Sequence, residues 1–498
     1  MVSTAPARRR AAPSRSKRPI LARKQREEAA RFRRSLTLVG LSAAAPGSAQ
    51  LIAGDRRVGT IALRAWAGLV GLTVLVLLLV PLDELAGLVV RPGLLTAFKM
   101  LACTVLLAWV ALIVDAWRLG HPPSLNRRHR LIMVVTTLAL SALVATPLIA
   151  AARYASAARD AVVALFPSGE AAATSDGRLN ILLLGADAGS GRVGLRPDSV
   201  NVVSVDVRSG RPLLVSLPRN LEKARFPAGS AAARRFPDGF AGEGERTEWM
   251  LNATWTYGEA NPDLFPGPDG PGVTAVEQAV EGTLGLPIHY YVIVDLNGFR
   301  DLIDALGGVT IRVEEELPIG QGGQVLEPGL RRLTGYEALW YARSRSSSSD
   351  YARMDRQRCV LGAILHEADP ATVLKNFTAL ADASTSLLTT NIPQEQLPDL
   401  VEMAWQAKDQ PVGSLQLVPP LVAPADPDIA VIVELIDEAI ESARGDRSAS
   451  AASPAPSEPS SIGPSATEPT PDPGHGGGAF RSTDGQSAVD LSSVCSYS

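Results

Sequence analysis

The sequence predicts an α/β protein: a layered extracytoplasmic domain with a central mixed β-sheet flanked by helices, preceded by an all-α transmembrane region. Two observations predict this architecture. Three apolar stretches before residue 153 are each long enough to span a bilayer. After residue 178, short β-branched runs alternate with amphipathic helical patterns, as in domains whose helices cover a central sheet.

The membrane region is predicted to cover residues 36–152. Its spans are expected at about 58–80, 94–114 and 131–152. The stretch 36–53 is weaker, because it is rich in Ala, Ser and Gly, and is expected to be interfacial or re-entrant.

Charge indicates three spans. Residues 1–35 form a basic tail, and the loop at 115–130 is also basic. With three spans both lie in the cytoplasm, as the positive-inside bias requires, whereas a fourth span would put the loop outside. We therefore expect a multi-pass protein of the cell membrane, with a cytoplasmic N-terminus and an extracytoplasmic chain after residue 152.

The extracytoplasmic part is predicted to begin with an Ala-rich linker at 153–178. A globular α/β domain follows at 179–445, with its core at 179–385. Residues 446–498 are rich in Ser, Pro and Gly and cannot bury a core, so a disordered tail is expected there.

Periodicity assigns the elements of the domain in chain order. The run LNILLLG at 179–185 is continuously apolar and ends in glycine, and SVNVVSVD at 199–206 alternates, so both read as strands. Further strands are expected at 213–217, 289–295, 309–313 and 413–418. Helices are expected at 247–258, 272–284, 297–306, 335–342, 350–367, 371–382, 393–408 and 427–443.

Two of the three cysteines are expected outside the membrane. Cys359 and Cys495 would share an oxidising exterior, where a disulfide persists. The alternative is two unpaired thiols. A bond between them would attach the C-terminal segment to the helix at 350–367.

Five arginines are concentrated between Trp340 and Cys359: Arg343, Arg345, Arg353, Arg356 and Arg358. Helical spacing from residue 350 puts Asp350, Arg353 and Gln357 on the apolar face, with Arg356 at its edge. Arginines there require anionic partners, and the guanidinium fork suits phosphate. The cluster therefore predicts an anion site. An internal salt-bridge network around Asp350 or Asp355 is the alternative.

Two carboxylates occur near the ends of neighbouring strands. Asp187 follows the first strand and Asp198 precedes the second. Such a pair could hold Mg²⁺ together with phosphate oxygens, although Asp is also an ordinary turn residue. Arg219, after Pro218, ends the third strand, and Asn252 lies in the stretch MLNATWTYG.

These segments together resemble the LytR-CpsA-Psr family of cell-wall assembly proteins over about 179–385. The similarity follows NILLLGADAG, RPDSVNVVSVD, LVSLPRN, LNATWTYG, LPIHYYVIVDLNGFRDLIDALGGVTIRV, LTGYEALWYARSR and DYARMDRQRCVLGAIL in order. The resemblance implies a membrane-anchored phosphotransferase. Its substrates would be a polyprenyl-pyrophosphate-linked glycopolymer and a peptidoglycan acceptor, joined through a phosphodiester.

The resemblance also implies roles for individual residues. Asp187 and Asp198 match the pair that holds Mg²⁺, and Asp350 is the first candidate for general base. The substrate-binding set is Arg219, Arg343, Arg345, Arg353, Arg356, Gln357 and Asn252. Of these, Arg345 and Arg353 are also expected to act in catalysis.

The sequence departs from many relatives of the family at two positions. Relatives often have an arginine shortly after the first aspartate and an aspartate after Pro-Arg; here these positions read Gly189, or a residue near it, and Asn220. Two alternatives to ligation stay open: a non-catalytic protein that binds the lipid-linked glycan, and a pyrophosphatase. We expect no nucleic-acid partner, because basic residues outside the arginine cluster lie mainly at the inner face of the membrane.

Overall fold

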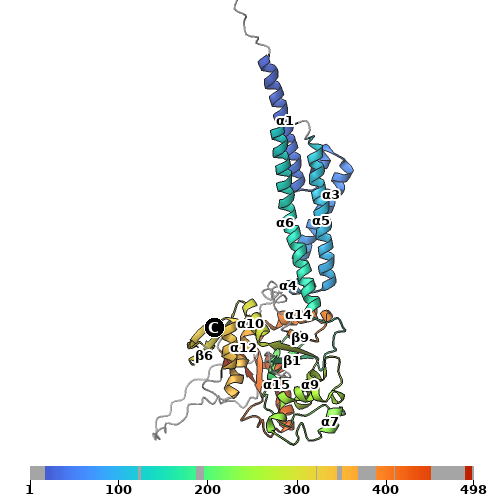
Figure 1. The fold of residues 1–498 in the computed structure, drawn as a ribbon. Helices are drawn as coiled ribbons and strands as arrows, with labels where there is room; N and C mark the ends of the chain where they lie inside the picture. Colours follow the sequence, from blue (N-terminus) through green and yellow to red (C-terminus); the bar gives the residue numbers. More distant parts are fainter. Residues whose placement is uncertain are drawn as a thin grey trace, which may run out of the picture. The chain divides into compact units, whose positions relative to one another are not determined.

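The computed structural model describes residues 17–121, 125–186, 196–320, 322–344, 350–367, 388–408, 410–449 and 488–495. These residues form two compact units (Figure 1). The first contains the described residues up to Leu82 together with Gly93–Arg159. The second contains Asp83–Pro92 and the described residues from Asp160 onward.

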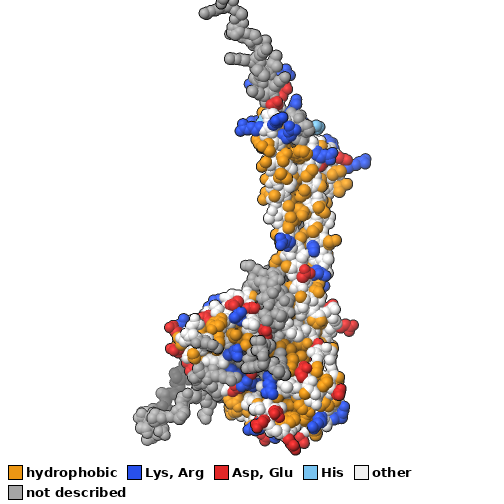
Figure 2. Space-filling model, viewed as in Figure 1, with side chains coloured by type: hydrophobic (Ala, Val, Ile, Leu, Met, Phe, Trp, Pro, Cys, Tyr) orange, Lys and Arg blue, Asp and Glu red, His pale blue; other side chains and the backbone are white. Residues whose placement is uncertain are grey.

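The first unit is entirely helical. Its helices are α1 (Lys17–Ala44), α2 (Ser48–Ala53), α3 (Arg56–Leu79), α5 (Pro92–Leu119) and most of α6 (Arg127–Leu165); the short α4 is Leu82–Val89. Among the described residues, α3, α5 and α6 are long and apolar enough to cross a membrane, and they overlap the three predicted spans. Exposed apolar side chains are concentrated on these helices, as the face drawn in Figure 2 shows, which is expected for contact with lipid.

The weak stretch at 36–53 forms the end of α1, a turn, and α2. Gly47 in the turn has φ of +93°, and a Cβ there would lie 2.6 Å from the carbonyl oxygen of Gly59 in α3. Gln50 is buried and donates to Leu112 O (3.0 Å) and to Asp115 Oδ2 (3.1 Å) in α5. The stretch therefore folds into a hairpin packed on α3 and α5.

The second unit is built on a mixed seven-stranded sheet of order β11-β10-β3-β2-β1-β4-β9. The strands are β1 (Arg178–Ala186), β2 (Pro197–Asp206), β3 (Pro212–Leu217), β4 (Tyr290–Asp295), β9 (Leu388–Thr390), β10 (Gly413–Gln416) and β11 (Val489–Asp490). The β1/β4 and β3/β10 pairs are parallel and the others antiparallel. The predicted mixed sheet is thereby confirmed.

Both faces of this sheet are covered, because successive side chains of each strand point to opposite sides. Leu182 and Leu184 of β1 pack into the main core with α9 (Pro271–Leu284) and α15 (Ile429–Ala449). Leu179 lies in a separate cluster with Leu397 and Met403 of α14 (Leu397–Ala407). The domain is therefore layered, with helices on both sides of the sheet.

A second core joins three helices to two small sheets. The helices are α10 (Leu296–Ala305), α11 (Gly335–Arg343) and α12 (Asp350–Glu367). One sheet pairs β5 (Val309–Val313) with β8 (Gly329–Leu333), and the other pairs β6 (Leu317–Ile319) with β7 (Gln324–Leu326). This part carries the arginine-bearing helix α12.

The prediction of one helix at 247–258 is wrong. The chain instead forms two 3-10 turns, Arg246–Glu248 and Leu251–Ala253, before the short helix α8 (Thr254–Ala260). The peptide N–H groups of Leu251 and Asn252 donate to Leu221 O and Arg219 O, so they are not available to a continuous helix. The helix predicted at 371–382 lies outside the described residues.

The C-terminal prediction also needs correction. Residues 488–495, assigned by composition to a disordered tail, form β11 and helix α16 (Leu491–Val494). A disulfide joins Cys495 to Cys359 of α12, with a Cα–Cα distance of 5.4 Å. Leu491 and Cys495 are buried against Leu214 of β3. Cross-linking and burial at the sheet edge hold a segment that its composition alone would leave unfolded.

Candidate functional site

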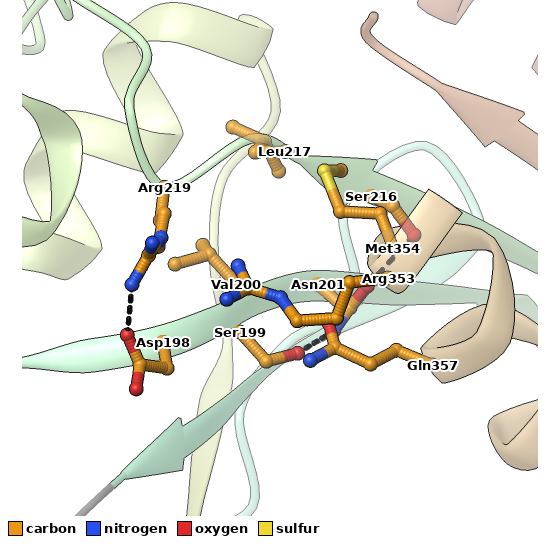
Figure 3. Close-up of a pocket in the computed structure, with 10 residues that line it drawn as sticks. All are labelled: Asp198, Ser199, Val200, Asn201, Ser216, Leu217, Arg219, Arg353, Met354 and Gln357. Carbon is orange, nitrogen blue, oxygen red and sulfur yellow. Dashed lines mark hydrogen bonds and ion pairs between the residues drawn. The ribbon is translucent and has the colours of Figure 1, made fainter. Parts of the chain in front are cut away.

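A polar pocket lies where β2 begins and β3 ends, beside the first turns of α12 (Figure 3). Its lining comes from these three elements and from Arg219, two residues after the end of β3. The lining residues are Asp198, Ser199, Val200, Asn201, Ser216, Leu217, Arg219, Arg353, Met354 and Gln357. Four of them were candidate site residues in the sequence.

Strand register places Asp198 against Arg219. Val200 of β2 pairs with Leu217 of the antiparallel strand β3, so Asp198, two residues before Val200, faces Arg219, two residues after Leu217. Arg219 Nη1 donates to Asp198 Oδ1 at 2.5 Å. Both side chains keep partial contact with solvent.

Asp350, the first residue of α12, meets two arginines through one oxygen. Its Oδ1 lies 2.9 Å from Arg353 Nη2 and 3.4 Å from Arg219 Nη2. The side chain of Arg353 is only 4% exposed. An acidic residue is also favourable at the positive end of the helix dipole. The salt-bridge network that the sequence left as an alternative is thus present around Asp350.

The floor of the pocket contains a hydrogen-bond chain that sequence reasoning missed. Ser216 Oγ donates to Asn201 Oδ1 (2.7 Å), and Asn201 Nδ2 donates to Ser199 Oγ (2.8 Å). These residues lie in strands that are otherwise largely apolar and covered on both faces. Buried polar side chains in such strands require partners, which is the signal that could have identified them.

Arg356 also lies in α12, but its side chain binds backbone carbonyl groups at the C-terminal end of α11. Its Nε donates to Tyr341 O (3.1 Å) and its Nη2 to Ser344 O (2.6 Å). Gln357 Nε2 donates to Ala342 O at 3.4 Å. The last carbonyls of a helix lack intrahelical partners, so α12 caps α11 through these two side chains.

Arg358 does not line the pocket. It pairs with Asp355 at 3.1 Å. Burial raises the pKa of Asp355, against the lowering effect of the nearby charges of Arg358 and Arg356. Burial also raises the pKa of Tyr341 to about 12, so this phenol stays protonated near neutral pH.

The remaining candidates divide into three groups. Asp187 and Arg345 lie outside the described residues. Arg343 is the exposed last residue of α11. Asn252 is not among the residues that line the pocket; its peptide N–H donates to Arg219 O at 3.1 Å, and its buried Oδ1 accepts no hydrogen bond from the described residues. Asn252 thus supports the segment that carries Arg219.

The chemistry of the site is compatible with Mg²⁺. Asp198 supplies one carboxylate at the end of β2. Ala186, the residue before Asp187, pairs with Pro197, the residue before Asp198. The last described residue of β1 therefore lies at the end of the sheet where Asp198 is found, and Asp187 itself lies outside the described residues; Mg²⁺ commonly binds one or two carboxylates plus phosphate oxygens. No cluster of three metal-binding side chains occurs among the described residues, so phosphate and water would complete such a site.

Taken together, the pocket and Asp350 beside it bring two guanidinium groups and two carboxylates to one sheet end. Guanidinium forks bind phosphate oxygens in a bidentate manner. A carboxylate beside them can accept a proton from a hydroxyl group. The arrangement suits phosphoryl chemistry on an anionic substrate.

Residues 148–419 match the family model described as the LytR_cpsA_psr family, which is more than half of the chain. Among curated proteins, polyisoprenyl-teichoic acid–peptidoglycan teichoic acid transferase TagU of Bacillus anthracis is 28% identical over 224 residues, covering 45% of this chain and 63% of that protein. TagU of Oceanobacillus iheyensis is 28% identical over 225 residues, covering 45% and 62%. The match thus spans less than two thirds of these relatives.

Solved structures with similar folds include TagV of B. subtilis, at 23% identity and a TM-score of 0.39, covering 54% of this chain and 99% of that one. A structure of TagT bound to LIIa-WTA has 22% identity and a TM-score of 0.39, covering 55% and 94%.

Proposed function

We propose, from the premise that the chain belongs to the LytR-CpsA-Psr family, that it is a phosphotransferase of cell-wall assembly. It would move a glycopolymer from a polyprenyl-pyrophosphate carrier to peptidoglycan. The names of the TagU relatives support this class of reaction. The glycopolymer itself is left open.

One observation carries the proposal. Arg219 and Arg353 come from different elements and approach the same oxygen of Asp350. Two cations aimed at one carboxylate oxygen could equally meet oxygens of a pyrophosphate, which carries more charge and more acceptors. Arg343, at the end of α11, and Arg345 would complete the positive surroundings.

The reaction would be an in-line displacement at phosphorus. The acceptor hydroxyl oxygen attacks the phosphorus attached to the glycan, and the bond from that phosphorus to the bridging oxygen breaks. Polyprenyl phosphate leaves, and the hydroxyl proton passes to a carboxylate, for which Asp350 is our first candidate. The arginines lower the barrier by neutralising the charge on the phosphates.

Asp187 and Asp198 would hold Mg²⁺ against the pyrophosphate. When bound, the ion would supply additional positive charge to the phosphate oxygens. Arg219, which donates to Asp198, would orient that carboxylate. The proposal also places the N-terminus in the cytoplasm and the catalytic domain outside, since only this arrangement brings the site to the wall.

The decisive test is reconstitution of the full chain with a lipid-linked donor and peptidoglycan fragments. Mg²⁺ is the variable, with EDTA as the matched control. We expect a phosphodiester-linked product and stoichiometric release of polyprenyl phosphate only when Mg²⁺ is present. Equal product formation in EDTA would show that the transfer reaction does not require Mg²⁺.

The same assay separates the alternatives. Tight donor binding without release of polyprenyl phosphate would indicate a tethering protein instead of an enzyme. Release of polyprenyl phosphate without a ligated product, at a rate independent of peptidoglycan, would indicate a pyrophosphatase.

A further inference from the structure

The hydrogen-bond chain in the floor of the candidate functional site has a direction. Ser216 Oγ donates to Asn201 Oδ1 (2.7 Å), and Asn201 Nδ2 donates to Ser199 Oγ (2.8 Å). A hydroxyl group can donate one hydrogen bond and accept two. Ser199 therefore uses an acceptor site within the chain and keeps its proton for another partner. No described residue accepts a hydrogen bond from Ser199 Oγ, so this donor is available to a bound molecule.

The chain ends at its most accessible member. Asn201 and Ser216 are only 6% and 3% exposed, whereas Ser199 is half-buried and lines the pocket. Arg353 and Gln357 extend from α12 toward the same strand (Figure 3). The hydroxyl group of Ser199 therefore belongs to the wall of the pocket that faces these two side chains.

A glycine leaves room beside this hydroxyl group. Ser199 of β2 pairs with Gly185 of β1. A Cβ atom at Gly185 would lie 3.1 Å from the Cβ atom of Ser199, which is closer than most such contacts. The missing side chain therefore keeps β1 from crowding Ser199 at the pocket.

The polar character of the floor is local. One step further from the pocket along each strand, Val203 of β2 packs against Leu214 of β3, together with Leu361 of α12. Asn201 and Ser216 form the preceding pair of this register, where an apolar pair would avoid the cost of burying polar groups. The polar pair is better explained by what it does for Ser199 than by packing.

We propose that Ser199 donates a hydrogen bond to a phosphate oxygen of the lipid-linked pyrophosphate, and that Asn201 is the positioning residue that directs this hydroxyl group into the pocket. The inference rests on the proposed function, because it names a further contact with the same substrate. Hydrogen bonds to ionised acceptors are stronger than those between neutral groups. Arg219 and Arg353 supply positive charge to the phosphates, and Ser199 supplies a neutral donor from the sheet.

The test measures binding of geranylgeranyl pyrophosphate, a short polyprenyl pyrophosphate, to the full chain in detergent, with geranylgeraniol as the uncharged control. This binding does not require the transfer reaction. Ser199→Ala should raise the Kd about tenfold to a hundredfold, because a hydrogen bond to a charged acceptor is lost. Ser199→Thr keeps the hydroxyl group and should bind within about threefold of wild type.

Ser204 provides the matched control. It is a buried serine of the same strand and is also bonded to an asparagine, since its Oγ donates to Asn180 Oδ1 at 2.6 Å. It does not line the pocket. Ser204→Ala should leave the Kd unchanged, and melting temperatures should show that each variant folds.

The positioning role of Asn201 is tested in a double-mutant cycle with Ser199. Asn201→Ala alone should raise the Kd several-fold, because the hydroxyl group of Ser199 is then free to turn away from the pocket. In the Ser199→Ala background the same change should add less than about twofold, since its effect passes through a hydroxyl group that is already absent. Additive effects would show that Asn201 does not act through Ser199.

Three further outcomes would refute the proposal. Equal Kd values for Ser199→Ala and wild type would do so, because a serine that instead donated to Asn201 would present only lone pairs to the phosphates. A Kd raised equally by Ser199→Ala and Ser199→Thr would show that shape, and not the hydroxyl group, decides binding. Failure of wild type to bind geranylgeranyl pyrophosphate would be the third. Absence of ligation together with Ser199-dependent binding would count against the proposed function alone.

Discussion

Arg219 Nη2 lies 3.4 Å from Asp350 Oδ1, although 131 residues separate the two positions in the chain. The contact joins the end of β3 to the start of α12. Arg353, one turn into α12, approaches the same oxygen at 2.9 Å. Asp350 therefore organises the two arginines that we propose meet the pyrophosphate, and its own role can be separated from theirs.

Asp350→Asn should lower kcat for ligation by about a hundredfold to ten-thousandfold with a smaller change in KM, because the amide cannot accept the hydroxyl proton. Steady-state kinetics of the reconstituted reaction measure both values. Asp355→Asn is the matched control, since Asp355 also pairs with an arginine three residues further along α12. A kcat within threefold of wild type in Asp350→Asn would exclude Asp350 as the base.

Arg353→Ala should reduce ligation at least a hundredfold, because it removes a cation from the developing phosphate charge. Arg358→Ala tests whether this loss is specific. Both arginines are buried and each pairs with the aspartate three residues before it, but only Arg353 lines the pocket. Activity per folded molecule should survive in Arg358→Ala. Equal losses in the two variants would indicate a general effect on α12.

Arg356→Ala should lower the free energy of unfolding by about 3 kcal/mol, because two hydrogen bonds from a buried charged group are lost. Arg356→Lys should recover less than half of this loss, since an ammonium group cannot span Tyr341 O and Ser344 O as the fork does. Denaturant unfolding measures the difference. The salt dependence of donor binding should match wild type, and a weaker dependence would instead place Arg356 on the phosphate.

Sequence reasoning predicted the long elements well because each has a clear period. β1 to β4 and helices α9, α10 and α12 bury regular apolar faces, and their predicted positions agree with the structure to within about two residues. β6, β7 and β9 have three residues each, too few to display a period of two. β11 has two residues and is held by a disulfide and by β10, neither of which is visible in local composition.

The site was predictable where chemistry depends on charge and spacing. Arg353 and Gln357 share the pocket-facing side of α12, as counting residues along a helix requires. The use of Arg356 as a cap for α11 could not be read from spacing, because it depends on where the preceding helix ends in space. Asn201 and Ser216 were not predicted as site residues, because neither residue is unusual by itself in the sequence. Only the pairing of β2 with β3 brings their side chains together.

Cys495→Ser should lower the free energy of unfolding by about 2–5 kcal/mol, because the bond closes a loop of 136 residues in the unfolded chain. Thermal unfolding of the full chain in detergent, with and without dithiothreitol, measures the effect. Reduction should destabilise wild type and leave Cys495→Ser unchanged. Cys103→Ser is the control, since Cys103 in α5 is not in a disulfide. Equal sensitivity of all three proteins to reductant would contradict the prediction.

Glu277→Gln should raise stability at pH 8 and leave it unchanged near pH 4. Burial in α9, with Glu281 and Asp269 nearby, raises the pKa of Glu277 to about 7, from an ordinary value of 4.5. The folded state therefore holds this proton more tightly than the unfolded state, so stability is full below pH 4.5 and falls as pH rises through 7. Glutamine cannot ionise, so Glu277→Gln should not show this fall in stability at high pH. Melting temperatures of both proteins from pH 4 to 8 measure the difference, with the exposed helical Glu434→Gln as control. A constant difference between Glu277→Gln and wild type across this range would show that Glu277 is not the titrating group.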